Sequence, residues 1–141
     1  MSQEKTPSKI TPFLVAALVC DVAVEDPTTR KKNLIGIFDR VNVAKFPVSR
    51  PMSLYLKITD AEGYYPIEIE YVFVNTGEVL GKAVGEIEIK DRTASADLFI
   101  PFPPLPIRQA GRYEFRVKAS GMFLGNTFVD AAERVLHSNP G

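Results

Sequence analysis

The sequence predicts an all-β domain, built as a two-sheet antiparallel β-sandwich of about eight strands. Two observations lead to this prediction. Apolar and polar residues alternate with a period of two, and short turn sequences separate the alternating segments. For example, Tyr113, Phe115 and Val117 alternate with charged residues. Because successive side chains of a strand point to opposite faces, this pattern indicates sheets with one buried and one solvent-facing side.

Turn sequences set the limits of the expected strands. Residues 60–63, 75–78 and 120–121 contain Gly or Asn, which tolerate the positive φ of tight turns. Short strands separated in this way, without helical patterns between them, are typical of a sandwich or a barrel. We expect strands at residues 13–25, 33–43, 52–59, 66–74, 79–89, 93–101, 112–119 and 122–130.

The first and last elements each have an alternative. Thr11 and Pro12 are typical of a helix start, but the β-branched valines that follow favour a strand, which we adopt. Residues 130–136 are expected to form a short helical turn or to fray. We place a flexible tail at 1–9, a single β-sandwich domain at 10–136 and a C-terminal tail at 137–141.

Length and charge bound the class of protein. The chain has 141 residues, 45% of them hydrophobic, which fits one domain with its own core. Lys and Arg together number 17, as do Asp and Glu, so the formal net charge is zero. Nucleic-acid-binding domains usually carry an excess of positive charge, so we expect no nucleic-acid partner.

The N-terminal region contains an apolar run that ends in a cysteine. Lys5 and Lys9 precede this run, which reaches Cys20 and would also fit a lipoprotein signal. Against that alternative, Pro12 interrupts the run and Val19 occupies the place of a small cleavage-site residue. We therefore expect a cytoplasmic protein with Cys20 as a buried free thiol. The run is too short to cross a membrane as a helix, and we expect no membrane partner.

Tyr113 supports an immunoglobulin-like architecture. It begins a strand after a loop, two residues before Phe115. In immunoglobulin-like sandwiches a tyrosine in this place bonds through its hydroxyl to the upstream backbone, forming a tyrosine corner. The disulfide and core tryptophan of antibody domains are missing, because the chain has one Cys and no Trp.

Five short strings occur in a characteristic order. They are Cys20-Asp21, Leu34-Ile35-Gly36-Ile37-Phe38-Asp39, Phe46-Pro47, Gly111-Arg112-Tyr113-Glu114-Phe115 and Leu124-Gly125. Over residues 18–130 the sequence resembles a family of uncharacterised bacterial proteins, classed as a domain of unknown function. The resemblance implies a bacterial β-rich domain and favours the cytoplasm. It implies no activity and no functional residues.

No motif for catalysis or metal binding stands out. Cys20 is the only cysteine and lies in an apolar segment, where a thiol is normally inert. His137 is the only histidine and lies near the C-terminus. For Asp21 and Asp39 we expect partners such as Arg or backbone amides, and for the acidic segment 60–63 an ordinary turn. The protein is therefore expected not to be an enzyme, with no catalytic, cofactor-binding or metal-binding residue.

The proline-rich string 101–108 has two interpretations. Pro103, Pro106 and Arg108 match the spacing of a peptide ligand for an SH3-type groove. Because the string lies between two expected strands, we favour an ordered crossover outside the sheet ladders. Three apolar side chains would then plug the end of the core: Phe102, Leu105 and Ile107.

The adjacent Tyr64 and Tyr65 are a candidate contact site. Neighbouring strand residues face opposite sides, so one of the two is expected to be exposed. An exposed tyrosine near Arg50 or Lys57 would suit a protein or sugar contact. The sequence assigns no other ligand-binding residue.

These observations favour a non-enzymatic protein-binding or assembly module. The alternative is a small-ligand module, for instance for carbohydrate, that uses Tyr64 or Tyr65. The partner is expected to be a protein, or a second copy of the chain in a homodimer.

Two segments are candidates for a free sheet edge. Segment 13–24 carries only Asp21 as an internal charge, whereas 79–89 is protected by Lys82, Glu86 and Glu88, so if either is an edge we favour 13–24.

Overall fold

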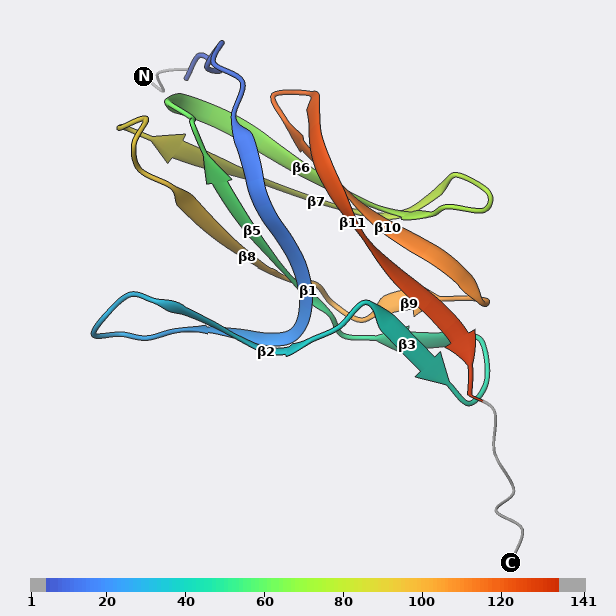
Figure 1. Ribbon diagram of the computed structural model, residues 1–141. Helices are drawn as coiled ribbons and strands as arrows, with labels where there is room; N and C mark the ends of the chain where they lie inside the picture. Colours follow the sequence, from blue (N-terminus) through green and yellow to red (C-terminus); the bar gives the residue numbers. More distant parts are fainter. Residues whose placement is uncertain (1–4, 135–141) are drawn as a thin grey trace, which may run out of the picture.

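The computed structural model describes residues 5–134, and these residues form 11 strands and no helix (Figure 1). The prediction of an all-β protein is thereby confirmed for this part of the chain. No helix long and apolar enough to cross a membrane is found there. The strands are β1 (Phe13–Glu25), β2 (Lys32–Ile37), β3 (Arg40–Val43), β4 (Val48–Arg50), β5 (Ser53–Thr59), β6 (Gly63–Phe73), β7 (Glu78–Ile89), β8 (Ala96–Pro101), β9 (Leu105–Ile107), β10 (Gly111–Ala119) and β11 (Met122–Glu133).

The strands form three sheets. One has the order β2-β1-β5-β8, the second β3-β11-β10-β6-β7, and the third consists of β4 and β9. The strand count of about eight was wrong for two reasons. The expected strand 33–43 is divided into β2 and β3, which join different sheets. The other reason is that β4 and β9 have only three residues each, too few to show a periodic pattern.

The core consists of side chains from the inward faces of the two larger sheets. Leu54, Leu56 and Ile58 of β5 alternate with half-buried residues and are themselves fully buried. From the other sheet, Phe115 and Val117 of β10 belong to the same apolar cluster and have no exposed surface. The period of two that predicted these strands therefore also identified their buried faces.

Strand β1 lies between β2 and β5 in its sheet, so the choice of segment 13–24 as the sheet edge was wrong. The other candidate, 79–89, belongs to β7, which ends the five-stranded sheet. The N-terminal part of β1 pairs with β5, and its C-terminal part pairs with β2. Beyond Cys20 the two strands β1 and β2 continue as a projecting hairpin (Figure 1). Val19 points into the core and is 2% exposed, so it has no free surface to offer a partner.

The two ends of the described chain lie against other strands. Lys5 forms an ion pair of 2.8 Å with Glu88, and the Ser8 amide donates to the Tyr64 carbonyl. Residues 130–133, expected as a helical turn or a frayed end, belong to β11 and pair in parallel with β3. Residues 135 and 136 of that expectation lie outside the described part of the chain.

Tyr113 forms the predicted tyrosine corner. Its hydroxyl donates to the Gln109 carbonyl at 2.8 Å and accepts from the Arg108 and Gln109 amides at 3.1 and 3.3 Å. Beside it, the Tyr71 hydroxyl donates to the Pro106 carbonyl at 3.0 Å. The two rings stack with centroids 5.5 Å apart. Both tyrosines therefore attach the crossover between β8 and β10 to the five-stranded sheet.

Replacing Tyr113 by Phe should lower the free energy of unfolding by about 1–2 kcal/mol, because a buried carbonyl and two amides lose their partner. Urea unfolding measures the change. Tyr64→Phe is the matched control, since the Tyr64 hydroxyl bonds only to the exposed Glu86 carboxylate. Equal stabilities of Tyr113→Phe and the wild type would show that the corner contributes nothing.

Candidate functional site

The residues considered for catalysis do not converge. Asp21 and Asp39 are both exposed, and within residues 5–134 neither forms an ion pair. Cys20 is free and fully buried, as expected. Burial, with a smaller effect of Asp21, raises the pKa of its thiol and so disfavours the nucleophilic thiolate. His137 lies outside the described residues.

The described residues also contain no group of three or more His, Cys, Asp or Glu placed to hold a metal ion.

The tyrosine pair divides as neighbouring strand residues should. Tyr65 is fully buried, and its hydroxyl donates to the Ile10 carbonyl at 2.7 Å. Tyr64 is half-buried, and its hydroxyl donates to Glu86 at 2.7 Å. The cation beside the Tyr64 ring is Lys5, at 5.6 Å from the centroid, rather than the expected Arg50 or Lys57.

The proline-rich string is an ordered crossover, as favoured above. Leu105 and Ile107 of β9 are 6% and 0% exposed and belong to the core. Phe102 packs against Phe115, with ring centroids 5.5 Å apart. Since β9 pairs with β4 and its ends are fixed in this way, the string is not available as an extended peptide ligand.

A shallow hollow lies where β4 and β9 meet. It has a volume of about 560 Å³ and is lined by Pro47, Val48, Ser49, Pro106 and Arg108. The register places Ser49 opposite Pro106. Because Leu105 and Ile107 point into the core, the side chains between and after them, Pro106 and Arg108, face outward. The hollow is therefore a consequence of the crossover that the buried tyrosines hold.

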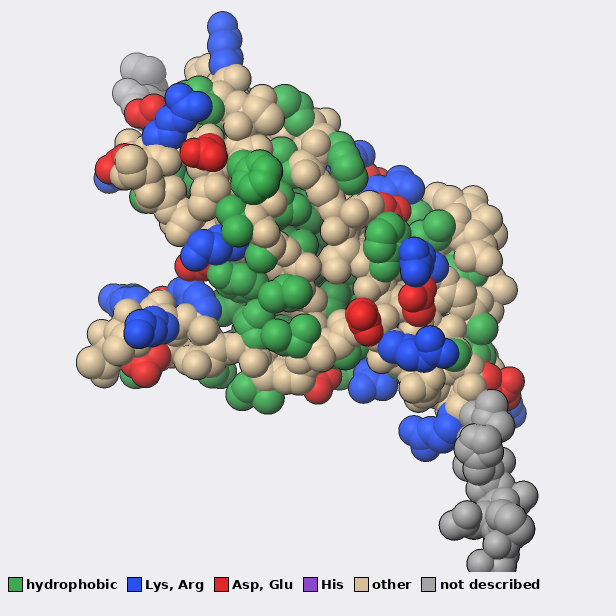
Figure 2. Space-filling view, in the orientation of Figure 1, with side chains coloured by type: hydrophobic (Ala, Val, Ile, Leu, Met, Phe, Trp, Pro, Cys, Tyr) green, Lys and Arg blue, Asp and Glu red, His purple; other side chains and the backbone are tan. Residues whose placement is uncertain are grey.

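Cationic side chains surround this end of the molecule. Strand β3 lies at the same end of the molecule as β9 (Figure 1), and its Val43 carbonyl accepts from the Arg134 amide at the end of β11. The Arg50 guanidinium lies 5.6 Å from the Phe38 ring, just before β3. Figure 2 shows Lys and Arg side chains, with Asp and Glu side chains among them, at the end that carries β3. The basic residues of this end are Arg40, Lys45, Arg50, Arg108, Arg112 and Arg134, and the acidic ones are Asp39, Glu78, Asp130 and Glu133.

Two of these cations are neutralised by ion pairs. Arg112 holds Asp130 through two contacts of 2.8 and 3.2 Å, and Arg108 lies 3.2 Å from Glu78. The hydrogen bond from Arg112 holds the pKa of Asp130 below its usual value, with a smaller contribution from Arg40. Within residues 5–134, four basic side chains of this end form no ion pair: Arg40, Lys45, Arg50 and Arg134. We call these four residues the cationic end. The carboxylates of Asp39 and Glu133 also form no ion pair within the described residues, so this end of the molecule keeps two more cations than carboxylates.

The outward face of the five-stranded sheet differs, because its charges are paired across strands. Lys118 lies 2.6 Å from Glu70, Arg116 lies 2.8 Å from Glu114, and Lys82 is paired with Glu68. Glu70 and Glu114 are each only 7% exposed. The hydrogen bond from Lys118 lowers the pKa of Glu70 and keeps this carboxylate ionised. This face is therefore nearly neutral, unlike the cationic end.

The sequence model of a protein family, described as "Family of unknown function (DUF6941)", matches residues 15–129. The chain belongs to this family. The resemblance seen in the sequence is thereby confirmed. The search of curated proteins gave no match for this DUF6941 chain.

The solved structures that are similar to this DUF6941 chain include Pseudomonas fluorescens alkylpurine DNA glycosylase AlkC bound to DNA containing an abasic site analog. The TM-score is 0.51 at 13% identity, and the similarity covers 89% of this chain and 31% of the glycosylase chain. The DUF6941 chain thus spans less than a third of the glycosylase, and the similarity concerns the fold.

This neighbour corrects the expected partners, which were a protein or a second copy of the chain, with no nucleic acid and no membrane. The similar protein is bound to DNA, so the exclusion of nucleic acid was wrong. The physical reason is that net charge sums over the whole chain and hides local differences. Residues 60–91 hold eight Asp and Glu but only two Lys, and they offset the cations elsewhere.

Cys20 should react with a thiol reagent at least about tenfold more slowly than an exposed thiol, since burial limits access and raises its pKa. The matched control is a second thiol placed by Val22→Cys, because Val22 lies on the same strand and is 47% exposed. Absorbance assays with an aromatic disulfide measure both rates. If wild-type protein reacts as fast as the added thiol, Cys20 is not a buried residue.

Proposed function

We propose that this chain is a non-enzymatic module that contacts nucleic acid through the cationic end. The observation that carries the proposal is the set of four basic side chains at the cationic end that form no ion pair within residues 5–134. Phosphate contacts from Lys and Arg supply most of the affinity of proteins for nucleic acid. The DNA-bound state of the structural neighbour supports nucleic acid as the class of partner.

The composition of the cationic end suits phosphate contacts. Three of its four residues are arginines, whose planar guanidinium groups match phosphate oxygens better than the point charge of lysine. The end is also held firmly, since β3 pairs with β11 and β4 pairs with β9. Arg40 and Arg50 lie on these strands, while Lys45 lies in the connection between β3 and β4 and Arg134 directly follows β11. Side chains on strands are positioned more closely than side chains on loops, so Arg40 and Arg50 lose less entropy when they bind.

The structure supports the two functions expected from the sequence less well than it supports nucleic-acid binding. A protein-binding or assembly module was expected to use segment 13–24 as a free edge, but β1 lies between β2 and β5 in its sheet. The carbohydrate alternative would depend on Tyr64 alone, since Tyr65 is fully buried. The cationic end therefore moves the proposal to nucleic acid.

Our proposal also keeps two expectations from the sequence, one about the architecture and one about the cellular location. A two-sheet sandwich of immunoglobulin-like architecture is supported by the shared core and by the Tyr113 corner. A cytoplasmic, unprocessed chain is supported by the position of Cys20 in the middle of β1. Cleavage before Cys20 would remove the part of the strand that pairs with β5.

Fluorescence anisotropy with a labelled DNA duplex tests nucleic-acid binding. The double variant Lys45→Glu/Arg134→Glu should bind at least about tenfold more weakly, and the slope of log K against log salt should fall by about 2. Lys90→Glu/Arg92→Glu is the matched control, because both residues are exposed, lie outside the cationic end, and form no ion pair within residues 5–134.

The control double variant should change the affinity by less than about threefold. Equal losses for the two double variants would show that only net charge matters and would overturn the proposed site. Absence of binding by the wild type at low salt would overturn the proposed function.

The intact mass of the protein from its native host tests the cytoplasmic, unprocessed form. The mass should include the residues before Cys20 and no lipid. A chain that begins at Cys20 and carries acyl groups would contradict this expectation.

A further inference from the structure

The projecting hairpin of β1 and β2 is a second surface, separate from the cationic end. Strand β1 pairs with β5 only as far as Cys20, which lies opposite Ser53. From Cys20 opposite Ile37 to Glu25 opposite Lys32, β1 pairs with β2. At about 3.3 Å per residue, this two-stranded part is roughly 17 Å long. Figure 1 shows it extending away from the strands that enclose the core.

The two faces of the projecting hairpin differ. Directly opposite residues of paired strands share a face. On one face Ala23, Leu34 and Lys32 are half-buried, and the Lys32 ammonium lies 5.4 Å from the centroid of the Phe99 ring on β8. This face is therefore turned toward the sandwich. The solvent-facing residues are aliphatic, and each is between 47% and 56% exposed: Val22, Val24, Ile35 and Ile37.

The acidic side chains of β1 do not lie on the solvent-facing side. By alternation, Asp21 and Glu25 belong to the face that is turned toward the sandwich. Glu25 pairs there with Lys32 at 2.5 Å, and the Arg30 guanidinium lies 3.9 Å from it. Lys31, which directly precedes β2, forms no ion pair within residues 5–134. The solvent-facing side of the hairpin is therefore aliphatic, with cations at its tip.

The turn at the tip is ordered by its own hydrogen bonds. The Asp26 carboxylate accepts from the amides of Thr28 and Thr29 at 2.8 and 3.1 Å, and the Asp26 carbonyl accepts from the Arg30 amide at 2.8 Å. Arg30 has a φ of 63°, a conformation that glycine adopts more readily. The backbone of the turn therefore does not account for the arginine. An ordered turn also loses little entropy when it binds a partner.

The shape of the projecting hairpin matches the major groove of a DNA duplex. This groove is about 12 Å wide and about 8.5 Å deep and admits a two-stranded ribbon, whereas the minor groove is only about 6 Å wide. The hairpin is long enough to reach the floor of the major groove. The methyl group of thymine lies in this groove and is contacted by apolar side chains.

We propose that the projecting hairpin enters the major groove of duplex DNA, where Val22, Val24 and Ile35 contact thymine methyl groups. This inference rests on the proposed function, because the cationic end binds phosphates of the same duplex. Figure 2 shows Lys and Arg side chains on the hairpin as well as at the end that carries β3. Arg30 and Lys31 provide the phosphate contacts at the tip.

Fluorescence anisotropy with two duplexes of the same A·T-rich sequence tests the groove contact. In the second duplex deoxyuridine replaces thymidine, which removes the methyl groups and leaves every phosphate in place. The wild type should bind the thymine duplex at least about fourfold more tightly, because a buried apolar group is lost from the uracil duplex.

The two duplexes also separate this inference from the proposed function. Equal affinity for both would overturn the groove contact and leave phosphate binding by the cationic end intact. Absence of binding to either duplex at low salt would overturn the proposed function, and the groove contact with it.

The double variant Val22→Ser/Ile35→Ser locates the contact. The two side chains are directly opposite and exposed, so their truncation leaves the core unchanged. The variant should bind both duplexes equally, within about threefold of the affinity of the wild type for the uracil duplex. Val79→Ser/Val84→Ser is the matched control, because these β7 valines are also exposed, and it should keep the preference for thymine. A hairpin variant that keeps the wild-type preference would refute the contact.

An aliphatic face beside cations would also suit an anionic lipid surface. The ribbon shape and the DNA-bound state of the structural neighbour favour DNA. Sedimentation with phosphatidylglycerol vesicles decides between them. The wild type should bind these vesicles no better than Val22→Ser/Ile35→Ser does. Vesicle binding that depends on the two aliphatic residues would assign this face to lipid and contradict the inference.

Discussion

Tyr71 and Tyr113 stack in the core and donate their hydroxyls to two carbonyls of one crossover, those of Pro106 and Gln109. This crossover carries β9, which in turn pairs with β4. A buried carbonyl without a partner is costly, so the hydroxyls fix both the path and the depth of the crossover. The hollow beside Arg108, and the separation of β4 from the larger sheets, depend on this anchoring.

Charge is used in two different ways on the surface. On the outward face of the five-stranded sheet, Lys118 and Arg116 neutralise carboxylates that are almost fully covered. The lowered pKa of Glu70 means that this pair stabilises the fold above the ordinary carboxyl pKa, and the contribution is lost as the pH falls through the folded-state value. At the cationic end the basic groups remain in water. Such groups contribute little to stability, and the proposed nucleic-acid contact depends on them.

The sequence predicted the long elements well. The alternating segment 13–25 is β1, and the residues around Tyr113 form both the strand and the corner that their pattern indicated. The three-residue strands were not predictable, because a pattern of period two needs more residues to be recognised. The division of the expected strand 33–43 into β2 and β3 at Phe38 was not predictable either. The segment is apolar on both sides of the point where the chain changes sheets.

The candidate sites were hidden for a different reason. The cationic end brings together β3, β4 and the end of β11, so no local motif contains its residues. Its positive charge is also not visible in the net charge of the chain, because the β6–β7 region is acidic. Only the pairing of strands shows which charges are neighbours. The Tyr64–Tyr65 prediction was more successful, since the alternation of strand side chains needs no knowledge of tertiary contacts.

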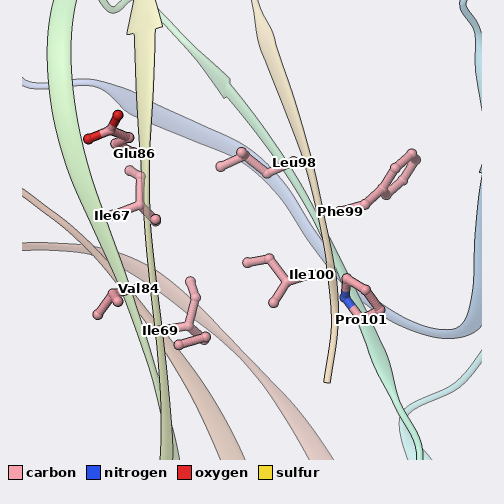
Figure 3. A pocket seen from close by; sticks show the side chains of 10 residues that line it. Ile67, Ile69, Val84, Glu86, Leu98, Phe99, Ile100 and Pro101 are labelled. Carbon is pink, nitrogen blue, oxygen red and sulfur yellow. The ribbon is translucent and has the colours of Figure 1, made fainter. Parts of the chain in front are cut away.

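The core is incompletely packed between β7 and β8, where the inward residues of β7 are small (Figure 3). A valine at position 83 or 85 would cover Ile69 or Ile67 and bury more apolar surface, which normally stabilises a sheet. The backbone permits it, because neither position requires a positive φ and Gly85 has open space at its Cβ. Stability alone therefore does not explain Gly81, Ala83 and Gly85 at successive inward positions. The open side between β7 and β8 therefore results from three small residues at successive inward positions, and not from a backbone that excludes larger ones.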